Sequence, residues 1–337
     1  MRTTVVDVAR EAGVSVATVD RVLNSRAGVS ERTRAIVFES ARRLGYLPEG
    51  ANGAAAAVVR LDFVLPAGGN QFMATLKDEI ESQARARPGL EISVCAIEGF
   101  NPDTLAAALL NFRGETDGLG VVALDHPAVR EAIRALCASG VQVATLVSDI
   151  LYVPRVAYVG VDNRAAGRLA GYLMRRFIGA ERAGQVALFA GSLSYRGHEE
   201  REIGFRHILA EEAANLRIVE LREMHDDSER AYAEAASLLD AYPDLAAIYN
   251  LGAGNSGVAR ALKERGRERS VTFIAHEISA ENRLLLLDGT LDAVIDQNPR
   301  VEAREALNIL EHAVRGAPYA PHPPRLHAIF KENIPDV

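Results

Sequence analysis

The chain contains only two cysteines in 337 residues, Cys95 and Cys137. They lie far apart in the sequence, and neither has the spacing or the histidine and cysteine partners of a metal site. We therefore expect two reduced cysteines that serve packing, one on a strand and one on a helix. We predict no metal and no cofactor.

Long apolar runs are also lacking. No stretch of 18 consecutive apolar residues occurs, and the first residues do not show a charged segment followed by an apolar one. The sequence therefore predicts neither a membrane-spanning helix nor an export signal. We expect a cytoplasmic protein without a membrane partner.

Positive charge is scarce over the chain as a whole, whose formal net charge is −7. Residues 1–48 are different, because they hold eight arginines and five acidic residues and so carry +3. The other residues then carry −7 − 3 = −10. Since binding to a polyanion needs clustered basic side chains, we expect any such contact at the amino-terminal segment.

Residues 7–24 have the pattern of two short helices joined by a turn that contains a glycine. Apolar side chains recur at helical spacing in the first helix, which gives it one face for a small core: Val5, Val8, Ala9 and Ala12. Gly13 allows backbone conformations that strain other residues, and Ser15 is a good N-cap for the second helix. The turn is therefore chemically specified.

A third helix is predicted from Ser30, as its N-cap, to about Leu44. Its apolar side chains, Ile36, Val37, Ala41 and Leu44, have the spacing to close a three-helix bundle. In the second helix, Val19, Val22 and Leu23 are expected to pack inward.

The opposite face of the second helix carries hydrogen-bonding groups. Arg21 has the geometry to donate twice to a guanine, Val16 and Ala17 are suited to contact with a thymine methyl, and Ser15 and Thr18 suit phosphates. The residues that we predict to contact DNA are Thr4, Ser15, Val16, Ala17, Thr18, Asp20, Arg21, Asn24, Ser30, Thr33 and Tyr46.

The first 48 residues resemble the lactose-repressor (LacI) family. The resemblance rests on residues 7–24 together with the motifs Val29–Arg34 and Leu44–Pro48, which follow at the family's spacing. It implies a DNA-binding regulator. Because the helix-turn-helix of such a protein reads half-sites, we expect a homodimer on a roughly palindromic operator in double-stranded DNA.

Two positions depart from the family's pattern. Asp20 stands where the family usually has serine; it would either fix the guanidinium of Arg21 or accept from a cytosine amino group. In the linker, Ala55 stands where the family has the leucine that enters the minor groove. Two glycines, Gly50 and Gly53, also disfavour a hinge helix there, so a flexible tether is the alternative.

After the linker, apolar strand-like runs alternate with amphipathic helical stretches, which is typical of parallel sheets. The number of runs indicates two α/β lobes rather than one open sheet. The strand candidates are residues 61–65, 91–97, 120–124, 141–146, 156–160, 185–189, 217–222, 246–249, 271–275 and 291–295.

Ligands of open parallel sheets bind beyond the carboxyl ends of the strands. Carboxylates, amides and an arginine at such positions suit the hydroxyls of a monosaccharide or polyol, and an aromatic side chain can cover its apolar face. The candidate effector-binding residues are Asn70, Phe72, Asp125, Asp149, Arg201, Asn250, Glu277 and Gln297. Each one also has a plain alternative as a helix cap or a solvated side chain.

The large domain resembles the periplasmic sugar-binding proteins, whose fold LacI-family regulators carry. The motifs Gly191-Ser192, Arg201–Phe205 and Val294–Pro299 match phrases that recur in that fold. The resemblance favours Asp149, Arg201 and Gln297 as ligand contacts.

One motif favours a different class of protein. Residues 252–257 read Gly-Ala-Gly-Asn-Ser-Gly after a predicted strand and before a helix, which is the G-x-G-x-x-G pattern of dinucleotide-binding folds. It leaves an NAD-dependent enzyme as the alternative function. No adjacent catalytic set accompanies it, and His276 beside Glu277 is more typical of packing or ligand contact than of a general base.

Together the patterns predict an all-α helix-turn-helix headpiece over residues 1–48, a linker over 49–59, and a two-lobed α/β domain of the periplasmic-binding-protein type over 60–337. We expect a transcriptional repressor, not an enzyme, that a small carbohydrate or polyol controls.

Overall fold

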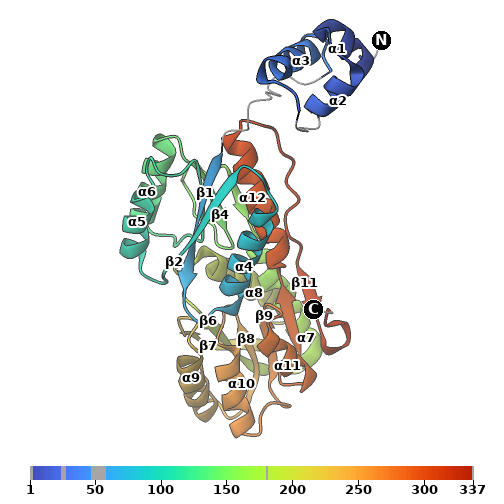
Figure 1. The fold of residues 1–337 in the computed structure, drawn as a ribbon. Helices are drawn as coiled ribbons and strands as arrows, with labels where there is room; N and C mark the ends of the chain where they lie inside the picture. Colours follow the sequence, from blue (N-terminus) through green and yellow to red (C-terminus); the bar gives the residue numbers. More distant parts are fainter. Residues whose placement is uncertain (1–2, 24–27, 47–57, 180, 336–337) are drawn as a thin grey trace. The chain divides into compact units, whose positions relative to one another are not determined.

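The computed structural model describes the whole chain except residues 1–2, 24–27, 47–57, 180 and 336–337. The chain divides into two compact units, Met1–Val58 and Val59–Val337 (Figure 1). Among the described residues, no helix is long and apolar enough to cross a membrane.

The first unit is a bundle of three helices: α1 (Val5–Ala12), α2 (Val16–Leu23) and α3 (Glu31–Arg43). Gly13 ends α1 with a φ of 68°, the left-handed conformation in which glycine is unstrained. As predicted, the hydroxyls of Ser15 and Ser30 cap the next two helices by accepting from the backbone N–H groups of Thr18 and Thr33. The turns are therefore fixed by side-chain hydrogen bonds.

The core of this bundle consists of small and branched apolar side chains from all three helices. Its buried members are Val8, Ala9, Val19, Val22, Val37 and Ala41. The prediction for Ile36 was wrong: its side chain is 43% exposed, because α3 turns it away from the face that carries Val37 and Ala41. The predicted DNA contact Asn24 and the Ala55 hinge position lie outside the described residues.

The second unit has two lobes. The sheet of the first lobe is all parallel, in the order β2-β1-β3-β4-β5. Helices α4 and α12 pack together on it, and so do α5 and α6 (Figure 1). Its elements are β1 (Val59–Ala67), α4 (Gln71–Arg85), β2 (Leu90–Glu98), α5 (Pro102–Leu110), β3 (Gly118–Val121), α6 (Pro127–Ala138), β4 (Gln142–Leu146), β5 (Ala157–Val159) and α12 (Pro299–Val314).

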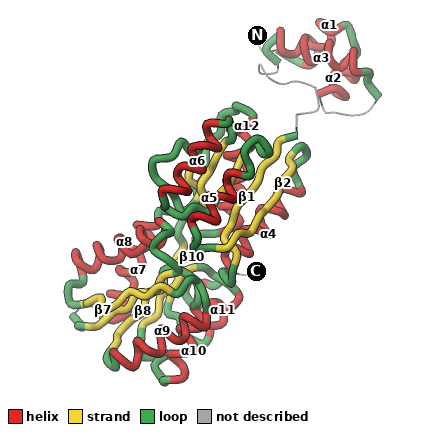
Figure 2. Tube along the Cα trace, turned by 90° about the vertical axis from the view of Figure 1, so that its left-hand side faces the viewer, coloured by secondary structure: helices red, strands yellow, loops and turns green. Residues whose placement is uncertain are grey.

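The sheet of the second lobe has the order β11-β10-β9-β8-β6-β7, and only its edge strand β11 is antiparallel. Helices cover both sheets (Figure 2). The elements are α7 (Asn163–Ile178), β6 (Gly184–Ala190), α8 (Arg196–Glu212), β7 (Leu216–Glu223), α9 (Ser228–Ala241), β8 (Leu245–Asn250), α10 (Asn255–Glu264), β9 (Thr272–His276), α11 (Ala280–Leu287), β10 (Ala293–Asp296), β11 (His327–Ile329) and the short 3₁₀ helix η1 (Lys331–Asn333).

The ten predicted strands are all present, and their ends differ from the prediction by a few residues. The largest difference is at β3, which ends at Val121 rather than at Leu124. Residues 122–124 are buried without belonging to a strand, so their apolar side chains alone could not reveal where the strand stops. Strand β11 was missed, because it is only three residues long and follows a segment rich in proline.

The chain passes between the lobes three times: after β5, after β10, and again between α12 and β11. This arrangement turns the carboxyl ends of the strands of both sheets toward one cleft. The prediction that both cysteines serve packing holds only in part. Cys137 on α6 is half-buried against the first core, but Cys95 on β2 is exposed.

Candidate functional site

The headpiece presents one polar face of α2. Val16, Ala17, Asp20 and Arg21 are exposed there, whereas Val19 and Val22 on the other face are fully buried. The hydroxyls of Ser15 and Thr18 lie 2.8 Å apart at the start of the helix. This is the geometry that a recognition helix needs in the major groove, namely a rigid inner face and small residues around one arginine.

The other predicted DNA contacts have structural partners as well. Thr4 forms a capping box with Asp7 at the start of α1, and the hydroxyls of Ser30 and Thr33 lie 2.9 Å apart at the start of α3. Tyr46 is half-buried and packs against the bundle core. These residues hold the bundle together whether or not they also meet phosphates.

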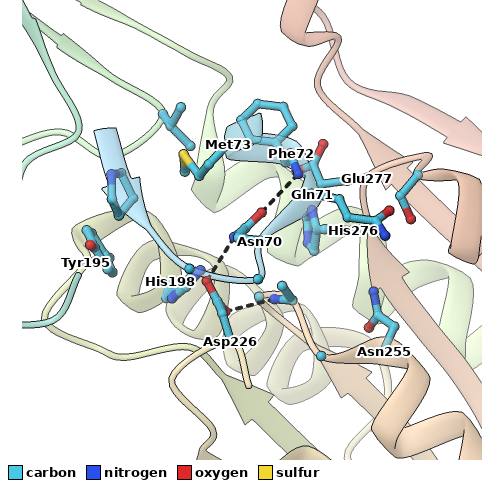
Figure 3. Close-up of a pocket in the computed structure, with 18 of the residues that line it drawn as sticks. Asn70, Gln71, Phe72, Met73, Tyr195, His198, Asp226, Asn255, His276 and Glu277 are labelled. Atoms are coloured by element: carbon cyan, nitrogen blue, oxygen red, sulfur yellow. Dashed lines mark hydrogen bonds between the residues drawn. The ribbon is translucent and has the colours of Figure 1, made fainter. Parts of the chain in front are cut away.

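The second unit has a cleft between its two lobes, with a volume of about 1030 Å³ out to its mouth. Segments that follow β1, β2, β3 and β4 line it from the first lobe, and segments that follow β6, β7, β8, β9 and β10 line it from the second. Five of the eight predicted effector-binding residues line this cleft: Asn70, Phe72, Arg201, Glu277 and Gln297. Figure 3 labels three of them, Asn70, Phe72 and Glu277.

Arg201 on α8 is the buried cation of the cleft. Its Nε donates to Asn163 Oδ1 at 2.7 Å, and its Nη1 donates to the carbonyl of Leu251 at 2.7 Å. Its Nη2 lies 4.0 Å from Glu277 Oε1. Two fixed bonds hold the guanidinium in one orientation, so it is a rigid donor on the floor of the cleft.

Glu277 and Gln297 follow the neighbouring strands β9 and β10. Gln297 Nε2 donates to Glu277 Oε1 at 2.6 Å, while Glu277 Oε2 and Gln297 Oε1 are buried without a partner. Glu277 has a φ of 66°, which is a strained value for a residue with a side chain. Burial raises the pKa of Glu277 to about 8; nearby Asp296 acts in the same direction, and Arg201 opposes it.

Hydrogen bonds join the lobes directly across the cleft. Asn70 Nδ2, which follows β1, donates to Asp226 Oδ2 at 2.8 Å, while Asn70 Oδ1 caps α4 by accepting from the backbone N–H of Phe72 (Figure 3). The backbone N–H of Gly197 donates to Ser148 Oγ at 3.2 Å. The structure is therefore a closed form, with the lobes in contact.

Three predicted effector contacts do not line the cleft. Asp125 pairs with Arg130, Asp149 pairs with Arg155 and accepts from the Thr145 hydroxyl, and Asn250 donates to Ala253 O and to Asn255 Oδ1. Asp125 and Asp149 follow strands, as expected, and Asn250 is the last residue of β8. Their side chains turn to partners nearby, so we correct these three assignments to structural roles.

Several lining residues were not predicted. They include the aromatic and histidine side chains Phe100, Tyr195, His198, His225 and His276, together with Asp226 and Asn255. Phe100 from the first lobe stacks on His225 from the second at 4.9 Å, and its ring meets Tyr195 edge-on at 5.5 Å. Phe100 and Asp226 follow the strands β2 and β7. The rule that ligands bind beyond strand ends therefore points to these two residues as well.

Burial disfavours the charged form of two histidines of the cleft, His276 and His198. Burial lowers the pKa of His276, whose Nε2 lies 2.8 Å from the Tyr249 hydroxyl. Burial also lowers the pKa of His198, which contacts Ser192. Among the described residues, no three histidine, cysteine or acidic side chains are grouped so that they could hold a metal ion.

The glycines of residues 252–257 have identifiable structural roles. A Cβ on Gly257 would lie 2.0 Å from the Ser228 carbonyl, so this glycine lets α10 pack closely on α9. Gly254 has a φ of 83° at the N-cap of α10. A Cβ on Gly252 would lie 2.7 Å from Asp226 Oδ1, so the space that a pyrophosphate takes in a dinucleotide fold is filled here by a carboxylate.

Comparison with known proteins identifies both units. The family model of the lacI family of bacterial regulatory proteins matches residues 4–49, and that of the periplasmic binding protein domain matches residues 59–318. The transcriptional regulator DegA of Bacillus subtilis is 26% identical over 247 residues, which cover 71% of this chain and 70% of DegA.

Relatives of the second unit alone are also found. The D-ribose/D-allose-binding protein of Pseudomonas aeruginosa is 24% identical over 257 residues, covering 71% of this chain and 76% of that protein. The structure of GanP, a glucose-galactose binding protein from Geobacillus stearothermophilus, matches with a TM-score of 0.76 and 24% identity over 82% of this chain and 99% of its own. The shared feature is the two-lobed fold.

The molecule is thus a DNA-binding headpiece joined in one chain to a two-lobed ligand-binding domain. The chain belongs to the lacI family of bacterial regulatory proteins and carries a periplasmic binding protein domain. Nothing in the comparisons supports the NAD-dependent alternative.

Proposed function

We propose that this regulator is a repressor whose effector is a monosaccharide or polyol bound in the cleft of residues 59–337. One observation carries the proposal. Gln297 Oε1 is a buried acceptor without a donor, and the carboxyl Oε2 of Glu277 is buried without a hydrogen-bond partner, beside the fixed guanidinium of Arg201. A buried acceptor without a partner costs free energy, and a ligand hydroxyl can donate to it and accept from an arginine.

The composition of the cleft supports the same class of ligand. Phe72, Phe100 and Tyr195 supply apolar surface for the C–H face of a sugar ring. Two relatives are named for such ligands, the D-ribose/D-allose-binding protein and the glucose-galactose binding protein. The identity of the sugar is left to experiment.

Control of DNA binding follows from the three chain passages between the lobes. An effector that touches both lobes favours their closed arrangement over an open one, and only such differential binding can shift a conformational equilibrium. We propose that the closed and open forms of a homodimer hold the two headpieces differently on a palindromic operator. A protein that acts on chromosomal DNA in this way works in the cytoplasm.

The first test is a calorimetric titration of the full-length protein with D-ribose, D-allose, D-galactose, D-arabinose and polyols. Gln297→Leu removes the buried amide acceptor but keeps a side chain of similar size. We expect it to weaken the binding of the sugar found by about tenfold. Asp125→Asn is the matched control, because Asp125 does not line the cleft. It should leave the affinity for the sugar within about twofold of the wild type.

Titration with NAD completes this test. NAD binding without any sugar binding would contradict the proposed effector class and favour the enzyme alternative. Equal losses in Gln297→Leu and Asp125→Asn would instead remove Gln297 from the binding site.

A further inference from the structure

The carboxylate of Asp226 sits in a cradle of glycine backbone inside the cleft. An added Cβ on Gly191 would lie 2.4 Å from Asp226 Oδ1, and one on Gly252 would lie 2.7 Å from the same atom. A side chain at either position would displace the Asp226 carboxylate. Both glycines are therefore needed for the carboxylate to be where it is.

Two donors from opposite lobes fix this carboxylate. The backbone N–H of Ala253 donates to Oδ1 at 2.9 Å, and Asn70 Nδ2 donates to Oδ2 at 2.8 Å (Figure 3). Asn70 is the N-cap of α4, and Ala253 immediately precedes Gly254, the N-cap of α10, which makes no side-chain cap bond. The carboxylate thus lies where two helices begin, and helix N-termini favour negative charge.

The backbone before α9 is strained in order to place Asp226 there. His225 has a φ of 52° and Asp226 has a φ of 55°, values in the left-handed region that side chains disfavour. The backbone N–H groups of Met224 and His225 donate to Ala190 and Gly191 at 2.7 and 2.9 Å, and so hold the segment in position. Local preference alone would not put the carboxylate in the cradle.

We propose that Asp226 is a specificity-determining residue that rejects effectors bearing a phosphate or a carboxylate. Its charge occupies the position in the cleft to which the Ala253 N–H and the Asn70 side-chain amide donate. An incoming anion would lose those donors and meet a like charge a few ångströms away. The inference rests on the proposed function in that the cleft is taken as the effector site, and it narrows the effector to an uncharged sugar or polyol.

The other charged groups of the cleft do not cancel this repulsion. Arg201 already donates to Asn163 and Leu251 and lies 4.0 Å from Glu277. Two histidines lie beside the cradle: burial lowers the pKa of His198, and His225 stacks on Phe100 and lies 3.2 Å from Arg230 Nη1. Among the described residues that line the cleft, Arg201 is the only arginine or lysine, and its guanidinium is held by Asn163 and Leu251 rather than by Asp226.

The test uses inorganic phosphate and D-ribose 5-phosphate as probes on the full-length protein, with binding measured by calorimetry and by the shift of the thermal midpoint. Asp226→Gly empties the cradle and suits the positive φ, so the fold should persist. Asp226→Asn keeps the shape without the charge. Glu281→Gln is the matched control, because it removes one negative charge from the cleft lining but leaves the cradle closed.

We expect no phosphate binding by the wild type or by Glu281→Gln, and a gain in phosphate affinity of about tenfold or more in Asp226→Gly, with a smaller gain in Asp226→Asn. Phosphate binding by the wild type, or no gain in both Asp226 variants, would overturn the inference. An equal gain in Glu281→Gln would also overturn it, because net charge alone would then explain the effect.

This result does not depend on which sugar binds. If no variant binds any neutral sugar and Asp226→Gly still gains phosphate, the proposed effector class fails while the role of Asp226 stands. If sugars bind the wild type and Asp226→Gly gains no phosphate affinity, the role of Asp226 fails while the proposed effector class stands.

Discussion

At the scale of single residues, two buried carboxyl groups influence each other, Glu277 in the cleft and Glu302 on α12. Glu302 on α12 is 1% exposed with both carboxyl oxygens unpartnered, and burial raises its pKa well above the usual range, with Glu277 adding to the effect. Two carboxyl groups that both resist ionisation are stable only when protonated. The burial of Glu277 Oε2 without a partner costs free energy, which a hydrogen bond to a ligand would offset.

This pair predicts a dependence of stability on pH. Burial raises the pKa of Glu277 to about 8 in the folded protein, above its ordinary value of 4.5, so the folded state binds more protons than the unfolded state between these values. The free energy of unfolding should therefore fall as the pH rises through this window, by up to about 1.4 kcal/mol per pH unit for one group, and level off above it.

Urea unfolding of wild type and Glu277→Gln across the same pH range isolates this contribution, because the remaining groups are common to both proteins. The amide does not titrate, so the difference between the two curves should change steadily from about pH 5 to about pH 8. A difference that is constant with pH would show that Glu277 does not hold the proton.

At the scale of elements, helix α2 exposes Arg21 and buries Val19 and Val22. We expect Arg21→Ala to lose about 1 to 3 kcal/mol of discrimination between operator bases, because a paired contact to one base is lost. Selection of binding sites from a random DNA pool measures this. Arg10→Ala on α1 removes the same charge elsewhere in the headpiece and should weaken binding without changing the selected sequence; an unchanged sequence for Arg21→Ala would contradict its role.

The sequence predicted the positions of these elements better than the directions of their side chains. Helical spacing and capping serines located the three headpiece helices, since these signals act over a few residues. The rule of strand ends placed the backbones of Asp125, Asp149 and Asn250 correctly, but it could not foresee that Arg130, Arg155 and Asn255 would turn their side chains away from the cleft. Periodicity fixes where a residue is, and only tertiary contacts fix where its side chain points.

The same limit explains why Asp226 was missed. It stands beside Asp227, which caps α9 by accepting from the backbone N–H of Arg230, and the pair reads in sequence as an ordinary helix start. Its role depends on Gly191 and Gly252, which follow two other strands and meet it only in the folded sheet.

At the scale of the whole molecule, the sequence pattern of alternating strands and helices predicted two lobes but not which strands belong to each. The chain returns from the second lobe to build α12 into the first and then adds β11 to the second. These passages tie any change in the cleft to both lobes at once, and Asn70 and Asp226 already connect the two across it. A ligand therefore acts on the domain as one unit.

Such coupling must be reciprocal. If a saturating neutral sugar weakens operator binding by about tenfold, the operator-bound protein must bind that sugar about tenfold more weakly than the free protein, because both factors report one coupling free energy. Fluorescence anisotropy of a selected operator fragment, with and without sugar, gives the first factor, and calorimetric titration of sugar into free and operator-bound protein gives the second. Gln297→Leu should raise the sugar concentration needed without altering operator affinity in its absence. A sugar that binds the cleft equally well with and without operator has no differential affinity for the two states, and it would be a ligand of this protein but not its effector.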